Sequence, residues 1–469
     1  MKYIDQERIN NLLTDATKID SDRFEAILKK AKLLQRLTLE ESAALLLVKE
    51  PEYIQKIFIA ANFVKESIYG KRVVLFAPLY ISNLCVNTCL YCGFKSDNAQ
   101  LKRKALSTAE ISQQVQWLLK RGHKRILAVC GEAAPDGLKN IDYYLQAIKT
   151  IYQVSVGKNK IKRVNVNCAP LSVDDFKKLK SSGIGTFQIF QETYHDQTYR
   201  KMHIRGPKSD PDNRITAPDR AFAAGIDDIG IGALYGLYDW RFETLGLLTH
   251  IEHMEEEFGV GPHTISVPRI EPAEGAELSF NPPYKISDED FKKVVAVLRL
   301  AVPYTGIIMS TRESAVMRDT LLSLGVSQVS AESATSPGGY SDNRKTEASL
   351  TNRQAGSQFS LGDNRTIDEI VASLIAHDYI PSFCAACYRR KRTGEAFMKL
   401  AKPGTIKGKC SMNALITLKE YLDDFATAAV KEAGYKMIER YALKLAPAEL
   451  KMLKMFYEHL DSGVRDEYV

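Results

Sequence analysis

The chain has 469 residues, of which 45% are apolar, and its formal net charge of +7 is spread over the whole length without a long basic block. A surplus this dilute gives no support for a nucleic-acid partner. No apolar run reaches the ~20 residues of a membrane span, and the first residues are charged and lack a signal-peptide core. We therefore expect no membrane partner and a cytoplasmic location, where all eight cysteines stay reduced.

Residues 1–70 are predicted to form a helical extension. Thr38 and Glu41 make a capping box before an apolar run. Pro51 suits the first position of the next helix, and Gly70 suits its end. The segment carries no evident chemistry, so we expect it to brace or cover the domain that follows.

Residues 71–340 alternate between short β-branched runs and amphipathic stretches, such as the stretch opened by Ser107 and Glu110. This alternation predicts parallel strands connected by helices. Eight such units predict a (β/α)8 TIM barrel, with an open doubly wound sheet as the alternative. The predicted strands are Val73–Ser82, Arg125–Ala134, Arg163–Pro170, Thr186–Thr193, Asp227–Gly236, His263–Pro272, Thr305–Ser314 and Val326–Thr335.

The third predicted domain, residues 341–469, is mostly helical and carries a second set of cysteines. A loop rich in Ser, Gly, Thr and Asn, over residues 336–360, leads into it. Thr366 with Glu369, and Thr417 with Glu420, have the spacing of helix-starting capping boxes.

Three cysteines directly follow the first predicted strand: Cys85, Cys89 and Cys92, in the pattern C-x3-C-x2-C. A zinc site lacks a nearby fourth ligand, and a thioredoxin-like pair leaves one cysteine unexplained. Three thiolates are one too few for the usual all-cysteine iron–sulfur cluster. A four-iron cluster bound here therefore has one iron free to bind a small molecule.

A second set of three cysteines lies near the end of the chain: Cys384, Cys387 and Cys410. Structural zinc or unrelated thiols are the alternatives, although zinc requires a fourth ligand. We expect a second three-cysteine cluster with one open iron. Cys130 and Cys168 lie among apolar residues of predicted strands, and we expect them to be small core residues.

Catalytic groups of barrel enzymes lie at the carboxyl ends of the strands, and the predicted ends here are polar. Glu192 ends the fourth strand, and a basic loop with Arg200, His203 and Arg205, able to bind a carboxylate, follows it. Gly230 and Gly232 in the fifth strand permit close approach to a flat ring, although barrel packing also explains them.

Two arginines end later strands of the predicted barrel. Arg269 ends the sixth strand, and Arg312 follows Ser310 at the end of the seventh. An arginine inside a barrel mouth requires an anion. A substrate carboxylate fits this requirement better than a structural ion pair.

The C-x3-C-x2-C motif, with Tyr91 just before its last cysteine, resembles the signature of the radical SAM enzymes. The resemblance implies that the open iron binds S-adenosylmethionine and that a 5′-deoxyadenosyl radical forms. Tyr91 matches the aromatic position that meets the adenine. Glu132, at the end of the second strand, matches the acidic motif that accepts from the ammonium group of S-adenosylmethionine.

Over essentially the whole chain, this loop, the Ser-Thr-Arg-Glu strand end and the last three cysteines resemble the radical SAM tyrosine lyases of FeFe-hydrogenase maturation. The resemblance implies L-tyrosine as substrate, p-cresol and dehydroglycine (2-iminoacetate) as first products, and carbon monoxide and cyanide made at the second 4Fe-4S cluster. It also implies an extra iron with L-cysteine as its ligand, a donor such as ferredoxin or flavodoxin, and other maturation proteins as partners.

His263 lies at the start of the sixth predicted strand, which places it at the opposite mouth of the barrel from Cys85. The resemblance implies that this histidine helps hold the extra iron; a purely structural histidine is the alternative. Two rival functions remain. A thiamine-pathway 2-iminoacetate synthase stops at dehydroglycine, and an iron–sulfur scaffold never cleaves S-adenosylmethionine.

Overall fold

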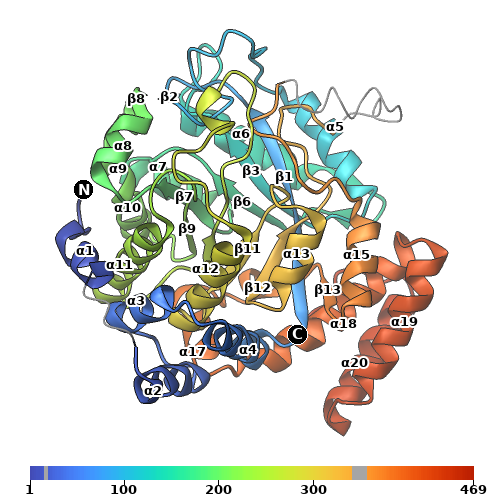
Figure 1. Ribbon diagram of the computed structural model, residues 1–469. Helices are drawn as coiled ribbons and strands as arrows, with labels where there is room; N and C mark the ends of the chain where they lie inside the picture. Colours follow the sequence, from blue (N-terminus) through green and yellow to red (C-terminus); the bar gives the residue numbers. More distant parts are fainter. Residues whose placement is uncertain (15–18, 341–355) are drawn as a thin grey trace.

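The computed structural model describes residues 1–14, 19–340 and 356–469 (Figure 1). Eight parallel strands follow one another around a sheet, and β12 pairs with β1 to close it into a barrel. The predicted (β/α)8 barrel is confirmed, and the open-sheet alternative is wrong. The barrel strands are β1 (Arg72–Ser82), β3 (Arg125–Cys130), β6 (Arg163–Asn167), β7 (Phe187–Glu192), β9 (Ile229–Ala233), β10 (Thr264–Ser266), β11 (Gly306–Met309) and β12 (Val326–Ser330).

Helices surround this barrel, and the expected N-terminal capping pairs start several of them. The predicted capping box of Ser107 and Glu110 opens α5. Ser172, Ser287 and Ser314 are N-caps of α7, α12 and α13, and each hydroxyl accepts from a backbone amide of the first turn. The outer helices are α5 (Thr108–Leu119), α6 (Asn140–Gln153), α7 (Val173–Ser181), α8 (Asp196–Met202), α9 (Pro211–Ile215), α10 (Ala217–Ala223), α11 (Trp240–Phe258), α12 (Asp288–Ala301) and α13 (Ala315–Leu322).

The N-terminal segment is helical, as predicted. Its helices are α1 (Gln6–Thr14), α2 (Ser21–Lys32), α3 (Leu39–Leu47) and α4 (Pro51–Tyr69). Thr38 and Glu41 form the capping box of α3, Pro51 begins α4, and Gly70 ends it with a φ of 62°. Helix α4 packs against α12 of the barrel, so the extension braces the barrel from outside (Figure 1).

The C-terminal segment joins the barrel through a ninth strand, β13 (Ile380–Ser382), which pairs in parallel with the start of β1. This strand was not predicted from the sequence. The helices here are α15 (Ile367–Ala376), α16 (Ala386–Arg389), α17 (Gly394–Ala401), α18 (Ile406–Asp424), α19 (Ala428–Ala442) and α20 (Pro447–Asp461). Helix α18 packs against β13 and also against α4, so both terminal segments meet beneath the barrel (Figure 1).

One predicted helix start in this segment is wrong. Thr366 and Glu369 do cap α15, but Thr417 and Glu420 lie inside α18. The Thr417 hydroxyl donates to the Asn413 carbonyl one turn earlier, and Glu420 pairs with Lys124 of the barrel. Of the predicted loop over 336–360, residues 341–355 lie outside the described part of the chain.

Two small antiparallel pairings complete the fold. Strand β2 (Thr88–Cys89) pairs with β8 (His203–Arg205), and β4 (Ser155–Val156) pairs with β5 (Asn159–Lys160). Two short 3-10 turns are η1 (Pro207–Ser209) and η2 (Glu277–Ser279). No helix within the described ranges has the length and apolar character that a bilayer crossing requires.

Candidate active site

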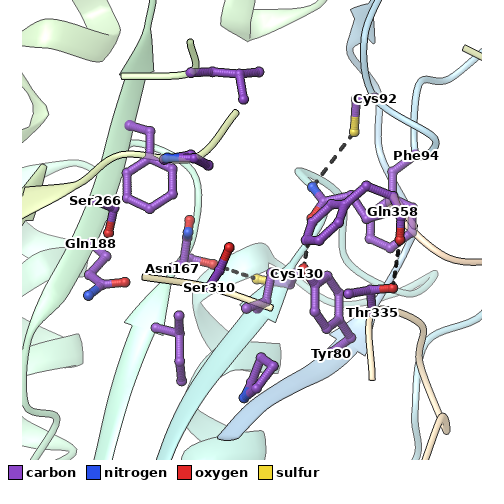
Figure 2. Close-up of a pocket in the computed structure, with 18 of the residues that line it drawn as sticks. Tyr80, Cys92, Phe94, Cys130, Asn167, Gln188, Ser266, Ser310, Thr335 and Gln358 are labelled. Atoms are coloured by element: carbon purple, nitrogen blue, oxygen red, sulfur yellow. Dashed lines mark hydrogen bonds between the residues drawn. The ribbon is translucent and has the colours of Figure 1, made fainter. Parts of the chain in front are cut away.

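A cavity opens at the carboxyl ends of the barrel strands, which we call the mouth of the barrel (Figure 2). All eight barrel strands, or the residues just after them, contribute to its wall. Cys85, Cys89 and Cys92, which we call the loop cysteines, line it together. The fold therefore brings the three predicted thiols to the end of the barrel where TIM-barrel enzymes have their active sites.

The loop that carries these cysteines is held by the strand pair β2–β8. Thr88 and Cys89 pair with Arg205 and His203, which come from far along the chain. The His203 Nδ1 lies 2.8 Å from the Tyr199 carbonyl, so it donates there, and Nε2 is left to accept from the Tyr91 hydroxyl at 2.8 Å. Burial keeps the pKa of His203 well below its usual value, which preserves this neutral tautomer.

Two side-chain amides point at loop sulfurs. Asn87 Nδ2 lies 3.7 Å from Cys85 Sγ and also donates to Glu132 at 2.6 Å. Gln358 Nε2 lies 3.7 Å from Cys92 Sγ, while its Oε1 accepts from the Tyr80 hydroxyl (Figure 2). Hydrogen bonds to ligand sulfurs are a means by which proteins tune iron–sulfur clusters. The sequence suggested neither amide, because Asn87 stands at a variable position of the cysteine pattern and Gln358 lies far along the chain.

The loop thiols lie in a closely packed environment. No group of three His, Cys, Asp or Glu side chains in the described segments converges as a site for one metal ion. Burial raises the pKa of Cys89 to about 12 and also raises the pKa of Cys92. Gly131 packs directly against the start of the cysteine loop, because a side chain at this position would overlap the Leu84 carbonyl.

Arg312 lines the cavity, together with Ser310. Its guanidinium lies 3.4 Å from the centroid of the Phe359 ring, and none of the described carboxylates is within ion-pair distance of it. Burial lowers the pKa of Arg312, which marks an incompletely compensated buried cation. The structure thus places Arg312 where a ligand anion can reach it.

Glu192 lies in the cavity wall and is part of a buried charge cluster. Lys208 Nζ is 2.7 Å from its carboxylate, and Arg214 is 3.7 Å away. Burial favours the neutral acid, but these two cations outweigh it and lower the pKa of Glu192. Its φ of 72° is unusual for a residue other than glycine and is typical of functional sites. Sequence reasoning missed both Lys208 and Arg214.

The predicted roles of three arginines need correction. Arg200 is largely exposed and pairs with Asp196 one helical turn earlier, outside the cavity. Arg205 is also exposed, and His203 supports Tyr91 instead of binding a carboxylate. Arg269 does not line the cavity either, because Glu313 and Asp288 bind its guanidinium. Arg269 is therefore a structural ion pair.

That Gly230 and Gly232 approach a flat ring stays a prediction, and the structure shows that barrel packing uses both glycines. Neither lines the cavity. A side chain at Gly230 would lie 2.6 Å from Thr264 Oγ1 and 2.7 Å from Gln188 Cγ, and one at Gly232 would overlap the Ser266 carbonyl. The glycines instead leave room inside the barrel for Gln188 and Phe190, their register partners on β7.

Cys130 and Cys168 pack with the barrel core, as expected, but both also line the cavity. Cys130 lies near the backbone carbonyl of Asn167 (Figure 2). Burial raises the pKa of Cys130 to about 12 and raises that of Cys168 well above its usual value. Both are therefore neutral thiols at physiological pH.

The other three cysteines, Cys384, Cys387 and Cys410, which we call the tail cysteines, meet at the opposite end of the barrel, its floor. Cys384 follows β13, Cys387 lies in α16, and Cys410 lies in α18. Burial and, to a smaller extent, the nearby thiols of Cys410 and Cys384 raise the pKa of Cys387 to about 12; burial and Cys410 also raise the pKa of Cys384. Arg72, at the start of β1, bonds to Cys410.

His263 immediately precedes β10, at this floor. Its Nε2 lies 3.5 Å from the Tyr388 hydroxyl, next to Cys387 in the chain, and its ring packs on Phe397. Burial lowers the pKa of His263, so the ring is neutral. A neutral imidazole is the form that binds a metal. The role of His263 as a metal ligand stays a prediction.

A closed parallel barrel whose first strand leads into a C-x3-C-x2-C loop defines the class of radical SAM enzymes. In agreement, residues 79–248 match the Radical SAM superfamily, and residues 266–380 match the Biotin and Thiamin Synthesis associated domain. The 2-iminoacetate synthase of Escherichia coli (strain K12) is 31% identical over 357 residues, which are 76% of this chain and 89% of that protein.

Two solved structures resemble the whole chain. A crystal structure of HydG, a maturase of the [FeFe]-hydrogenase, is 45% identical with a TM-score of 0.94, and the match covers 100% of both chains. HydG from Carboxydothermus hydrogenoformans is 39% identical with a TM-score of 0.82, over 96% of this chain and 97% of that one. The chain belongs to the HydG family of radical SAM tyrosine lyases. Membership implies S-adenosylmethionine and a 4Fe-4S cluster as cofactors.

Proposed function

We propose that the enzyme cleaves the Cα–Cβ bond of L-tyrosine to p-cresol and dehydroglycine at the mouth of the barrel, and converts dehydroglycine to carbon monoxide and cyanide at the floor. The product we propose is an iron–carbonyl–cyanide precursor of the FeFe-hydrogenase cofactor. We assign the first reaction to residues 71–340 and the second site to residues 341–469, with residues 1–70 as a brace.

At the mouth, the loop cysteines hold a 4Fe-4S cluster that, with S-adenosylmethionine bound, supplies a 5′-deoxyadenosyl radical. Tyr91 and Glu132 line the space for S-adenosylmethionine. Arg312 binds the tyrosine carboxylate, and Ser310 lies beside it in the wall. Fixing the carboxylate orients the amino group toward the radical, which is the contribution a protein makes to cofactor chemistry.

At the floor, the tail cysteines hold a second 4Fe-4S cluster, and His263 holds an extra iron that also takes L-cysteine as ligand. The observation that carries this proposal is the junction of the tail segment with the barrel. Strand β13 pairs with β1 and brings Cys384 beneath the same barrel whose other end holds the loop cysteines. An enclosed route protects dehydroglycine, which water hydrolyses.

The test is a turnover assay of the reconstituted enzyme with dithionite, S-adenosylmethionine and tyrosine, measuring p-cresol and carbon monoxide together. The wild type yields both. Cys384→Ala with Cys387→Ala retains p-cresol but loses carbon monoxide. Carbon monoxide and iron product from the double variant would overturn the second site.

A 2-iminoacetate synthase that stops at dehydroglycine is the second candidate, favoured by the 31% identity to the Escherichia coli enzyme. That match covers 76% of the chain. The same assay decides, because this candidate yields p-cresol without carbon monoxide even from the wild type. A non-catalytic scaffold yields neither product.

We further propose that a ferredoxin or flavodoxin supplies electrons, that other hydrogenase maturation proteins receive the product, and that the enzyme acts in the cytoplasm. The two full-length HydG matches support the maturation context. Electron transfer from a candidate donor is measured by following p-cresol formation with that donor in place of dithionite.

A further inference from the structure

Two basic segments flank the cysteine loop at the mouth of the barrel, residues 95–104 and residues 200–208. Together they hold eight lysines and arginines and one acidic residue, Asp97. In the whole chain the two kinds are nearly balanced, at 64 basic and 57 acidic residues. The positive surplus of the chain is therefore concentrated beside the loop cysteines, where two segments far apart in the sequence meet.

Both segments are bonded directly to the loop. Strand β8, in the second segment, pairs with β2 of the loop (Figure 1). A side chain at Gly206 would lie 2.9 Å from the Val86 carbonyl, so the two backbones touch there. On the other side, the Asn83 amide donates to the Lys104 carbonyl at 3.0 Å. The positions of these charges are thus fixed relative to the loop cysteines.

Three of the eight cations are free of carboxylates. Lys102, Lys201 and Arg205 are exposed, and none of the described carboxylates lies within ion-pair distance of them. Arg205 contacts a neutral group, Ser96 Oγ, at 3.4 Å. Arg103 donates to backbone carbonyls. The other four cations are paired: Lys95 with Asp97, Lys104 with Glu110, Arg200 with Asp196 and Lys208 with Glu192. The two segments therefore keep unneutralised positive charge at the surface.

Two apolar side chains lie exposed among these cations. Val86, in the cysteine loop, is 47% exposed, and Ile204, in β8, is 60% exposed. In the same strand pair, Cys89 and His203 are register partners and are buried. Cys89 lines the cavity. One strand pair thus has a loop cysteine on its inner face and an apolar surface on its outer face. An apolar centre with a polar rim is typical of protein interfaces.

This surface fits a donor of electrons. The proposed function requires an electron to reach the cluster held by the loop cysteines, and the rate of electron transfer falls steeply with distance. A donor therefore has to dock where the cysteine loop reaches solvent, which it does at Val86. A donor with an acidic surface is attracted to the free cations around that point, and long-range attraction of this kind speeds association.

We propose that this surface, formed by Val86, Ile204, Lys102, Lys201 and Arg205, binds a small acidic one-electron carrier protein; we call it the docking face. The inference rests on the proposed function and deepens it, because it states where the donor binds and which side chains recognise it. The three cations pair with carboxylates of the carrier, and the two apolar side chains contact the surface around its redox group. The complex is transient and its interface is small, as is usual for electron-transfer partners.

Reduction kinetics test the docking face. The reconstituted enzyme is mixed with reduced flavodoxin, an acidic carrier, and flavodoxin oxidation is followed at low and at high salt. Lys201→Glu with Arg205→Glu should lower the second-order rate constant about tenfold at low salt. At about 1 M salt the variant should match the wild type, because charges are then screened beyond about 3 Å. Dithionite, a small reductant, should support equal p-cresol formation in both proteins. Equal rate constants at low salt, or an equal loss with dithionite, would overturn the proposal.

Lys451→Glu with Lys454→Glu is the matched control. Both lysines are exposed on α20, which lies away from β8 (Figure 1). The control alters the net charge by the same amount and should leave the rate constant at the wild-type value. Ile204→Ser should lower the rate constant at low and at high salt alike, because it removes an apolar contact that salt does not screen. A loss in the control equal to that in Lys201→Glu with Arg205→Glu would overturn the proposal, since net charge alone would then explain the rates.

These results are distinguishable from a failure of the proposed function. Flavodoxin oxidation precedes tyrosine cleavage, so it decides the docking face even when the wild type yields no p-cresol, which would contradict the proposed function. Calorimetric titration with oxidised flavodoxin gives a second readout, in which Lys201→Glu with Arg205→Glu should weaken binding about tenfold at low salt. Binding of a DNA duplex to the wild type, with no binding of flavodoxin, would overturn the proposal in favour of a nucleic-acid partner.

Discussion

Val74 of β1 and Ser382 of β13 are register partners at the floor of the barrel. Two residues beyond Ser382 the chain reaches Cys384, so the pairing of these strands fixes where the tail cysteines begin. The same strand β1 leads, at its other end, to Cys85. One strand thus sets the positions of both cysteine sets.

Phe383 is expected to anchor the tail cysteines. It is buried, and its ring stacks on Tyr421 of α18 at 4.8 Å. Phe383→Ala should cost about 3–5 kcal/mol of unfolding free energy and lower the iron bound at the tail site. Urea unfolding and iron analysis measure both effects. The control Phe63→Ala, at a half-exposed position, should change neither; unchanged stability in Phe383→Ala would contradict the anchor.

Arg312 and Arg269 are expected to behave differently when each is changed to lysine. Arg312→Lys should lower p-cresol formation roughly 100-fold, because a lysine cannot replace planar, bidentate binding of a carboxylate. Arg269→Lys should instead lower the thermal midpoint, since Arg269 is bound by Glu313 and Asp288. Steady-state assays and thermal unfolding separate the two effects. Loss of turnover in Arg269→Lys at full stability would return Arg269 to the substrate site.

Iron incorporation is expected to rise with pH. Burial holds the pKa of Cys89 and of Cys387 at about 12 in the metal-free protein, so both thiols must lose a proton to bind iron. Metal affinity should therefore increase from pH 7 to 9, with proton release. Iron titration in weakly buffered solution measures both quantities. Iron affinity independent of pH would contradict this account.

Glu243 is expected to make stability depend on pH. Burial raises its pKa from 4.5 to about 8, although Thr193 and the Tyr194 amide donate to it. The folded protein thus holds a proton that the unfolded chain releases, so this stabilisation is complete below pH 4.5 and is lost as pH rises through 8.

Glu243→Gln should remove this dependence of the unfolding free energy on pH, which amounts to roughly 3–5 kcal/mol. Urea unfolding of the wild type and the variant at pH 5, 6.5 and 8 measures it. The variant should show a flatter profile than the wild type, and two parallel profiles would refute the assignment.

The Lys124–Glu420 ion pair is expected to hold α18 against the barrel. Both side chains are buried, and Glu420 also accepts from the Asp466 amide. Glu420→Ala leaves Lys124 buried without a partner and should cost about 3–5 kcal/mol, whereas removing both charges with methionines should restore most of the loss. Glu432→Ala, from the exposed pair with Lys436, is the control and should leave unfolding nearly unchanged. A double variant as unstable as the single one would contradict the pairing.

The eight barrel strands were predictable because most are apolar runs that alternate with helices, and several of those helices start at a recognisable cap. Strand β13 was not, because Ile380-Pro381-Ser382 is short and contains a proline. The Thr417–Glu420 spacing was misleading because the same pair of residue types can lie inside a helix, where the threonine hydroxyl bonds one turn back.

The candidate site was predictable where its residues form a local pattern, as the six cysteines do. The residues that contact this site from distant parts of the chain were not predictable. Glu313 neutralises Arg269 from 44 residues away, and Gln358 reaches Cys92 from 266 residues away. Lys208 meets Glu192 only because the chain folds back after β7. Such pairings depend on tertiary contacts that no local pattern encodes.

All eleven residues of β1 are buried, and a strand of this length spans ~33 Å from Arg72 to Ser82. Neighbouring strands hydrogen-bond it on both sides. The interval between the two cysteine sets is therefore set by a stiff backbone. If the proposed transfer of dehydroglycine takes place, the molecule must cover this distance by diffusion, because the strand cannot bring the two ends of the barrel closer together.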